Sequence, residues 1–420
     1  MFSLYKAKKS LEKMSGSKAV PCKNPEWGDL SVACFEDKNP SEKAQKLASI
    51  SGGTYFESAN ATGPFVNYAY SETFYRETLD ESLQEKFGGN PLKKEPPFLL
   101  EYSQPNPGKP MHLGHIRSTI IGDVCARTIR YSGTPVVRLN YLNDRGAHIA
   151  ELITAMEEFK ELPKVKNERD LLAYYVKIKK EIDENPPLKE KTRSVLEHLK
   201  DHQKQLKKIR DLSWTAFERN YKALDVQFDA IPLESELEED AQERVKECLE
   251  KGLAKKEPDG TIITQLEPEL SNTVLLRSNG TPLYFTSDLA LADWKWKNYA
   301  FARSMIFTAS EQNLHFRQLK LLLKKMGRPY ADAYGHKGHG LIRLLEGKMS
   351  TRQGRVILLE DVLSGVIEEA KTQVTKKGHA SSVKKTSEGL GIGALKFGVL
   401  RISLQKDITF DPQNEVQFEG

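Results

Sequence analysis

The stretch FLLEYSQPNPGKPMHLGH, residues 98–115, decides the fold. It begins with a short apolar run, 98–102, which is typical of a buried strand in a parallel sheet. A turn rich in Pro and Gly follows, and apolar residues then recur at helical spacing over 113–131 until Ser132-Gly133 ends the pattern. A second strand is predicted at 135–142. This strand–turn–helix–strand order is the opening of a doubly wound α/β sheet.

The sheet is expected to resume after a long charged insertion. Residues 147–232 carry many charges four apart and predict a pair of solvated helices. We prefer this interpretation to an RNA-binding arm, because acidic residues are interspersed throughout. Hairpin strands are predicted at 261–266 and 273–277, followed by a sheet strand at 304–308 and an amphipathic helix at 316–326.

The residues before the sheet predict a separate small module. Helical stretches at 41–50 and 71–87 flank a segment rich in Gly, Ser and aromatic residues, within which 65–68 predicts a strand. The run Gly88-Gly89-Asn90-Pro91, followed by two further prolines, marks the boundary. The predicted fold class is therefore α/β: a Rossmann-like, doubly wound parallel sheet with a helical insertion, preceded by a small α+β domain.

The composition indicates a folded protein that is neither membrane-embedded nor exported. The 420 residues are 39% hydrophobic and 29% charged, which disfavours disorder. No apolar run approaches the roughly 20 residues of a membrane helix, and the first residues lack the apolar core of a secretory signal. The four cysteines, which are too far apart to form a CxxC pair, predict a reduced, cytoplasmic protein. A net charge of +5 permits nucleic-acid binding without requiring it.

The motif His112-Leu113-Gly114-His115 carries the sharpest chemical signal. Two histidines three residues apart share one face of the first helical turn, where free backbone N–H groups and the helix dipole favour an anion. Gly114 lets a flat base or a backbone come close. The pattern suits ATP whose α-phosphate is attacked, with both histidines donating as charge develops. The alternatives are a zinc pair, for which no third ligand is near, and two surface histidines.

A second motif, GKMSTRQG at 347–354, is a Gly-bounded loop with two cations and two hydroxyls. Alone such loops are usually solvated surface. Following a second set of sheet-like segments, it could close over the pyrophosphate leaving group, with Lys348 neutralising charge in the transition state.

Together these motifs resemble class I aminoacyl-tRNA synthetases: HLGH is similar to their HIGH signature and KMSTR to their KMSKS loop. The order PNPGKPMHLGH, long insertion, YFTSD, ASEQNLHF, GKMSTRQG resembles arginyl-tRNA synthetases specifically. The resemblance runs from about residue 24 to the end of the sequence. KMSTR departs from KMSKS in lacking the second lysine, although Arg352 keeps a cation nearby and Lys109 adds another.

The resemblance implies site residues. Those expected to bind arginine are Glu101, Asn106, Tyr284, Asp288 and Gln312. Those expected to bind ATP are His112, Gly114, His115, His339, Gly340, Lys348, Met349, Ser350 and Arg352, with His112, His115 and Lys348 catalytic. Asn67, with Phe65 or Tyr68, is expected to contact an exposed tRNA base. A guanidinium is a planar fork that seeks carboxylates and a hydroxyl, which independently suits Glu101, Asp288 and Tyr284.

The implied activity is arginine–tRNA ligation: arginine and ATP give arginyl-adenylate, and the arginyl group passes to the terminal adenosine of tRNA(Arg). Mg²⁺ is expected on the phosphates, and no zinc. The alternatives are a paralog that activates arginine for another acceptor and a non-catalytic RNA-binding relative. The expected domains are a tRNA-contacting module at 1–95, a catalytic domain at 96–345 with an insertion at about 150–275, and the loop and stem-contact segment at 346–420. The family's C-terminal anticodon-binding domain is expected to be absent, so that the chain acts as a monomer or with a separate anticodon-binding polypeptide.

Overall fold

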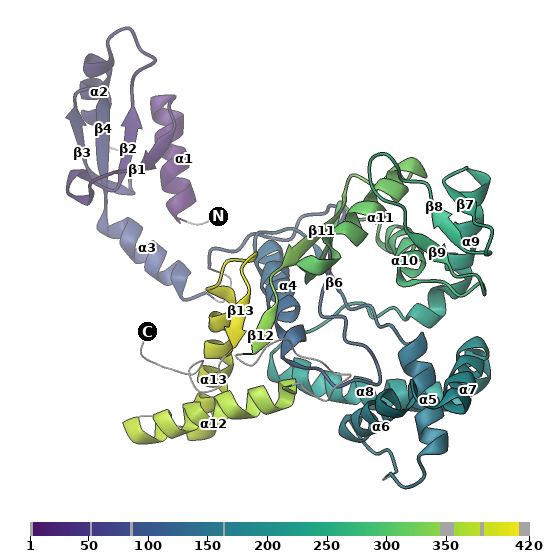
Figure 1. Cartoon of the computed structure of the whole chain (residues 1–420). Helices are drawn as coiled ribbons and strands as arrows, with labels where there is room; N and C mark the ends of the chain where they lie inside the picture. Colours follow the sequence, from purple (N-terminus) through teal and green to yellow (C-terminus); the bar gives the residue numbers. More distant parts are fainter. Residues whose placement is uncertain are drawn as a thin grey trace. The chain divides into compact units, whose positions relative to one another are not determined.

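The computed structural model describes residues 3–50, 53–84, 87–162, 164–344, 357–378 and 382–410. The chain divides into two compact units, Met1–Pro91 and Leu92–Gly420, and Figure 1 traces the elements of both.

The first unit is a small α+β domain. Its elements in chain order are α1 (Ser3–Ser15), β1 (Ala19–Pro21), η1 (Pro25–Trp27), β2 (Leu30–Ala33), α2 (Pro40–Ala48), β3 (Phe56–Thr62), β4 (Phe65–Tyr70) and α3 (Glu72–Ser82). The strands form an antiparallel sheet in the order β1-β2-β4-β3. Alternate residues of β4, among them Val66 and Tyr68, are fully buried in the domain core, because side chains on a strand alternate between its two faces.

The second unit is built on a four-stranded parallel sheet. Its strands are β5 (Phe98–Glu101), β6 (Val136–Leu139), β10 (Arg303–Ala309) and β11 (Tyr334–His339), in the order β11-β10-β5-β6. The segment at 230–233 runs parallel beside the end of β6 through bridges at Ala230 and Leu233. The chain thus winds outward from β5 in one direction and from β10 in the other, which confirms the predicted doubly wound α/β fold.

Helices and short strands complete the second unit, and part of them cover the two faces of this sheet. They are α4 (Leu113–Tyr131), α5 (Ala147–Glu158), α6 (Glu168–Glu181), α7 (Pro186–Glu197), η2 (Leu199–His202), α8 (Gln203–Ala223), η3 (Glu234–Leu237), α9 (Glu238–Glu250), β7 (Ala254–Lys256), β8 (Ile262–Thr264), β9 (Val274–Leu276), α10 (Tyr284–Tyr299), η4 (Ser310–Gln312), α11 (Asn313–Lys325), β12 (Ile342–Leu344), α12 (Leu359–Lys377), α13 (Val383–Leu400) and β13 (Ile408–Phe410). Leu99 of β5 packs into a cluster with α9, α10 and α11, whereas its neighbour Leu100 packs into a cluster with α4, α12 and α13. This alternation is the signature of a strand buried on both faces.

The predicted pair of solvated helices in the insertion is wrong. Helices α5 to α8 form a bundle with a buried core of its own, to which Ile149, Leu171, Tyr175 and Ile178 contribute. The many charges occupy the outer faces of these helices. They obscured an apolar stripe, 171, 174, 175 and 178, that follows helical spacing.

Candidate active site

The parallel sheet creates a place for a ligand at its carboxyl edge. Strand order reverses between β5 and β10, so the chain leaves these neighbouring strands in opposite directions. Doubly wound sheets bind ligands beyond the strand ends at such a point. Glu101 is the last residue of β5, and η4 with the start of α11 follows β10. The loop at 102–112 then leads to the first turn of α4.

His112 and His115 cap the first turn of α4 reciprocally. The Nδ1 atom of His112 accepts the backbone N–H of Gly114 at 3.0 Å, and Nδ1 of His115 accepts the backbone N–H of His112 at 3.1 Å. The two ring centroids are 4.0 Å apart. A nitrogen that accepts an N–H carries no proton, so each neutral ring holds its hydrogen on Nε2. The capping arrangement therefore gives the helix terminus two side-chain N–H donors.

Both imidazoles are neutral at physiological pH. Burial, with a smaller effect of Lys109, lowers the pKa of His112 to about 4. Burial also lowers the pKa of His115 well below its usual value, and the neighbouring His112 contributes. In the first turn of α5, burial followed by Lys109 lowers the pKa of His148 to about 3. Lys109 is thus near enough to act electrostatically on three histidines, and its ammonium lies 4.6 Å from the ring centroid of Tyr175 on α6.

Glu101 is engaged inside the protein. Its Oε2 atom pairs with Nζ of Lys295 on α10, and the two side chains are 3% and 0% exposed. Lys295 also lies 3.3 Å from the hydroxyl of Tyr334, and Glu101 Oε1 accepts the side-chain amide of Gln104 at 2.5 Å. The sequence interpretation missed Lys295, because a lysine within WKWKNY gives no sign of burial. The carboxylate stands at the expected edge, held by a buried cation.

Tyr284 and Asp288 both lie in the first turns of α10, as their spacing predicts. Tyr284 is 57% exposed, and its hydroxyl lies 3.9 Å from where a Cβ on Gly146 would stand. Oδ2 of Asp288 contacts Nε2 of His315 on α11 at 2.6 Å. Gln312 ends η4 one turn earlier and is exposed.

The sequence interpretation also missed Glu234, which follows the segment beside β6. One of its oxygens accepts the hydroxyl of Ser287 at 2.6 Å, while Oε2 is buried and has no hydrogen-bond partner among the described residues. Burial raises the pKa of Glu234 to about 7, and the charges of Asp288 and Asp144 add to the effect.

Tyr141 marks the centre of a carboxylate cluster. Burial raises its pKa well above the usual value, and four acidic groups contribute, in the order Glu234, Asp288, Glu101 and Asp144. Its buried hydroxyl has no partner among the residues that the structure describes. Three of these carboxylates have partners: Glu101 pairs with Lys295, Asp144 with Arg210 and Asp288 with His315. The unpartnered Oε2 of Glu234 and the unpartnered hydroxyl of Tyr141 are the oxygens that suit a planar cation with several N–H donors.

The end of β11 lies at the same carboxyl edge of the sheet, beside the end of β10. His339 is buried, and its Nδ1 atom lies 2.9 Å from the carbonyl oxygen of Gly340. A Cβ on Gly340 would stand 2.3 Å from the carbonyl oxygen of Lys406, so only glycine fits. Arg117 of α4, which is fully buried, donates to the carbonyl oxygens of Gly340 and of three residues at 403–406.

Backbone hydrogen bonds also join the start of α12 to the histidine motif. Leu113 N donates to the carbonyl of Ile357 at 3.0 Å, and Leu359 N donates to the carbonyl of Met111 at 2.9 Å. These bonds form an antiparallel bridge between His112 and Leu358. The expected ATP contacts Lys348, Met349, Ser350 and Arg352 lie outside the described residues.

Comparisons with known proteins identify the family. The family model described as tRNA synthetases class I (R), catalytic domain, matches residues 79–411. The arginine–tRNA ligase of Halothermothrix orenii is 32% identical over 94% of this chain and 73% of its own length. That of Lactobacillus johnsonii is 35% identical over 95% of this chain and 74% of its own length. The chain belongs to the class I arginyl-tRNA synthetase family.

Solved structures agree on the fold of this synthetase-family enzyme. Arginyl-tRNA synthetase from Thermus thermophilus superposes with a TM-score of 0.73 at 22% identity, covering all of this chain and 78% of its own. The enzyme from Plasmodium falciparum gives 0.68 at 21% identity, again covering 100% and 78%. The family uses ATP, arginine and tRNA(Arg) as substrates. Both alignments cover the N-terminal α+β domain and the helical insertion of this chain as well as its parallel sheet.

Of the three residues of the N-terminal domain that were expected to contact tRNA, only Phe65 is exposed. Phe65 is 39% exposed and Asn67, on the same face of β4, is 6% exposed and lies beside Cys22. Tyr68 points to the opposite face and is fully buried, so it cannot stack on the same base. The period of two along a strand separates Tyr68 from the other two residues.

Within the described ranges no helix is long and apolar enough to cross a membrane. No group of three or more His, Cys, Asp or Glu side chains in those ranges is placed to hold a metal ion.

Asn106, the remaining expected arginine contact, is half-buried in the 102–112 loop, where its backbone carbonyl accepts the backbone N–H of Lys109 at 3.2 Å.

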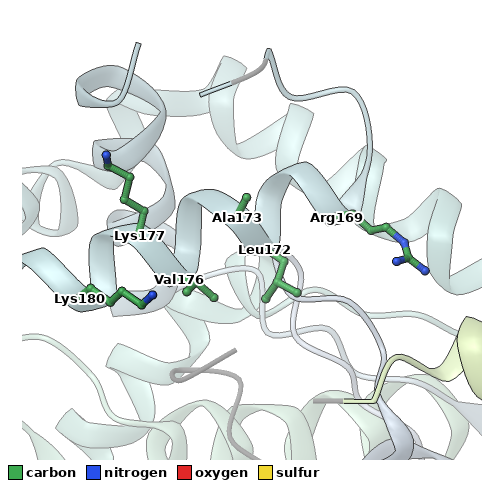
Figure 2. A pocket seen from close by; sticks show the side chains of 6 residues that line it. All are labelled: Arg169, Leu172, Ala173, Val176, Lys177 and Lys180. Atoms are coloured by element: carbon green, nitrogen blue, oxygen red, sulfur yellow. The ribbon is translucent and has the colours of Figure 1, made fainter. Parts of the chain in front are cut away.

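A groove of about 500 Å³ lies away from the sheet, along α6. Figure 2 shows its side chains projecting from successive turns of that helix: Arg169, Leu172, Ala173, Val176, Lys177 and Lys180. Arg169 pairs with Asp361 at 2.7 Å and also with Glu360, and Lys177 pairs with Glu161 at 2.5 Å. The charges of Arg169 and Lys177, two of the cations that line the groove, are therefore neutralised by these carboxylates.

Proposed function

We propose that this chain activates L-arginine with ATP to arginyl-adenylate and transfers the arginyl group to the 3′-terminal adenosine of tRNA(Arg). The observation that carries the proposal is the pairing of two complementary sites at one sheet edge. Neutral histidine donors at the start of α4 suit phosphate oxygens, and the carboxylates around Tyr141 suit a guanidinium. Membership of the arginyl-tRNA synthetase family supports both assignments.

On the ATP side, His112 and His115 donate through Nε2–H to oxygens of the α-phosphate. The arginine carboxylate attacks the α-phosphorus, the bond to the bridging oxygen of the β-phosphate breaks, and pyrophosphate leaves. Their low pKa values make them neutral donors that need no proton transfer, and the positive end of the α4 dipole adds to their effect. Lys109 supplies a cation near the phosphates, and the resemblance assigns a further one to Lys348. The resemblance assigns Gly114, His339 and Gly340 to the binding of ATP. Mg²⁺ supplied with ATP neutralises phosphate charge.

On the arginine side, Asp288 and Glu234 accept the guanidinium, and the hydroxyl of Tyr284 completes the donor–acceptor set. Asn106 and Gln312 suit the α-amino and carboxylate ends. The resemblance also assigns Glu101 to the arginine pocket; its charge is paired with Lys295, and its other oxygen holds the side-chain amide of Gln104. The acceleration comes from positioning and charge stabilisation, without a covalent enzyme intermediate.

In the transfer step, the terminal adenosine of the tRNA attacks the arginyl carbonyl and AMP leaves. Phe65 on the N-terminal domain, the exposed member of the three expected residues, is the proposed contact with an exposed base elsewhere in the tRNA.

The test is arginine- and ATP-dependent pyrophosphate exchange, measured with and without tRNA, together with charging of total tRNA. We expect both activities. Exchange without charging would instead support a paralog that uses another acceptor. No exchange under either condition would support a non-catalytic relative and refute the proposal.

The guanidinium assignment has its own test. Asp288→Asn should raise the KM for arginine about tenfold or more and leave the KM for ATP nearly unchanged, because a charge-assisted hydrogen bond contributes about 1.5–3 kcal/mol. Asp332→Asn is the matched control, since Asp332 is paired with Lys324 on the surface. Equal effects on both substrates would mean that Asp288 is misassigned.

A further inference from the structure

The loop that carries the histidine motif contains a left-handed turn. Ser103 has φ 80° and Gln104 has φ 49°, conformations that residues other than Gly adopt rarely. Such residues keep these angles only where surrounding contacts hold them. These contacts come from three places: Asn140 after β6, Thr119 on α4 and Tyr221 on α8 of the helical insertion.

The hydroxyl of Tyr221 makes the first contact between α8 and the 102–112 loop. It lies 2.8 Å from Oγ of Ser103 and accepts the side-chain amide of Asn140 at 3.0 Å. Asn140 in turn accepts the backbone N–H of Gln104 at 3.1 Å. One tyrosine hydroxyl therefore holds both residues of the left-handed turn, the first directly and the second through Asn140.

The same network reaches the first turn of α4. Thr119 Oγ1 lies 2.8 Å from Oγ of Ser103 and donates to the carbonyl oxygen of His115 at 2.7 Å. Tyr221, Ser103, Thr119 and Asn140 are all buried, so water cannot readily replace these bonds. The network of hydroxyl groups thus links the turn to the backbone carbonyl of a proposed catalytic histidine.

Ser213 makes the second contact, two turns earlier on α8. Its Oγ accepts the backbone N–H of Gly108 at 2.7 Å and donates to the carbonyl of Ile209. Gly108 has φ 86°, and a Cβ there would stand 2.2 Å from the Leu152 side chain of α5. The loop is therefore pressed against the insertion at Gly108 as well as bonded to it.

The spacing of the two contacts shows that one face of α8 serves the loop. Ser213, Phe217 and Tyr221 recur every four residues, which places them on one stripe of a helix, and all three are buried. Ser213 and Tyr221 hydrogen-bond to the 102–112 loop, and Phe217 between them is apolar.

We propose that Ser213 and Tyr221 are positioning residues for adenylate formation: through the 102–112 loop, α8 sets the orientation of His112 and His115. This inference rests on the proposed function and gives the charged insertion a role in that function. A displacement of about 1 Å at the reacting groups costs roughly a hundredfold in rate, so loss of either contact should reach the chemistry.

The experiment compares Tyr221→Phe and Ser213→Ala with Tyr174→Phe. Tyr174 lies in the same insertion and its hydroxyl donates to the carbonyl of Leu162 at 3.3 Å, so it controls for loss of a buried hydroxyl. We expect kcat for pyrophosphate exchange to fall about tenfold or more in the two α8 variants and less than twofold in the control. The KM values and the urea midpoint should stay close to those of the control.

A double variant, Tyr221→Phe with Ser103→Ala, tests whether the residues act through one network. We expect the combined loss of kcat to be smaller than the product of the single losses, because the second change removes a contact already broken. Multiplicative losses, or losses that follow the unfolded fraction, would show that α8 only stabilises the fold and would overturn the inference.

A readout independent of activity separates this inference from the proposed function. Imidazole ¹⁵N shifts of labelled protein should change for His112 and His115 in Tyr221→Phe and stay constant in Tyr174→Phe. Should the wild-type chain show no exchange, the proposed function fails while these shifts still decide whether α8 positions the histidines. Unchanged shifts together with unchanged kcat refute the positioning role.

Discussion

The substitution Glu234→Gln should stabilise the protein at alkaline pH and damage its use of arginine. The carboxyl has a pKa raised from 4.5 to about 7, chiefly by burial. Because the folded state holds this proton more tightly than the unfolded state, the group's contribution to stability is complete below pH 4.5. It is lost as the pH rises through 7. The loss reaches about 3 kcal/mol by pH 8, at roughly 1.4 kcal/mol per pKa unit.

Glutamine keeps the shape of the side chain and can still accept the hydroxyl of Ser287, but it does not ionise. Relative to wild type, the free energy of unfolding of Glu234→Gln should therefore rise by about 2–3 kcal/mol between pH 5 and pH 8. Urea unfolding without arginine, at unit steps of pH, measures this difference. Glu239→Gln is the matched control, because Glu239 is exposed on α9.

The same variant should raise the KM for arginine about ten- to a hundredfold, since it removes a charged hydrogen-bond acceptor from the guanidinium. The KM for ATP should stay within twofold. In wild type, the KM for arginine should also rise as the pH falls below 7, because protonation of Glu234 removes the same charge. A pH-independent stability difference combined with a normal KM for arginine would refute the assignment.

Three further outcomes are expected. Lys295→Met should lower the free energy of unfolding by about 3–5 kcal/mol in urea titrations, because it leaves a buried carboxylate unpaired; adding Glu101→Gln should recover much of this, and no recovery would contradict the pairing. His112→Ala should lower kcat for exchange about 10²–10³-fold, and the wild-type pH–rate profile should show no inflection from His112 between pH 6 and 8, since its pKa is about 4. Arg117→Lys should lower the urea midpoint, because one ammonium cannot reproduce four guanidinium–carbonyl bonds; an unchanged midpoint would contradict that role.

Much of the fold could be predicted because local signals agreed with the final structure. Helix α4 was predicted at 113–131 and has those bounds: His112 begins it with its own side chain as the cap, and the turn at Ser132 and Gly133 ends it. The short apolar runs at 98–102, 135–142 and 304–308 predicted the strands β5, β6 and β10. The strand β11 and the order β11-β10-β5-β6 were not predicted. The placement of Tyr284 and Asp288 on one helix likewise needed only local spacing.

The rest depends on contacts between distant residues. Glu234 lies within an acidic run, a pattern that is typical of a solvated segment. Its carboxyl oxygen is buried because the segment after α8 returns beside β6. Glu101 and Lys295 are 194 residues apart and neutralise each other in the core. The core of the insertion was also missed, because charged surface residues outnumber the apolar residues of its buried stripe.

The backbone bridge between the two motif regions has a consequence for protein engineering. Leu113 and Leu359 are the first residues of α4 and α12, the helical position where proline is ordinarily harmless because its missing N–H has no partner in the helix. The chain itself uses proline there, at Pro40 and Pro186. At Leu113 and Leu359, however, the N–H groups form the bridge. A stabilisation campaign that places proline at helix starts should therefore spare these two sites, where the exchange would disconnect α12 from the histidine motif.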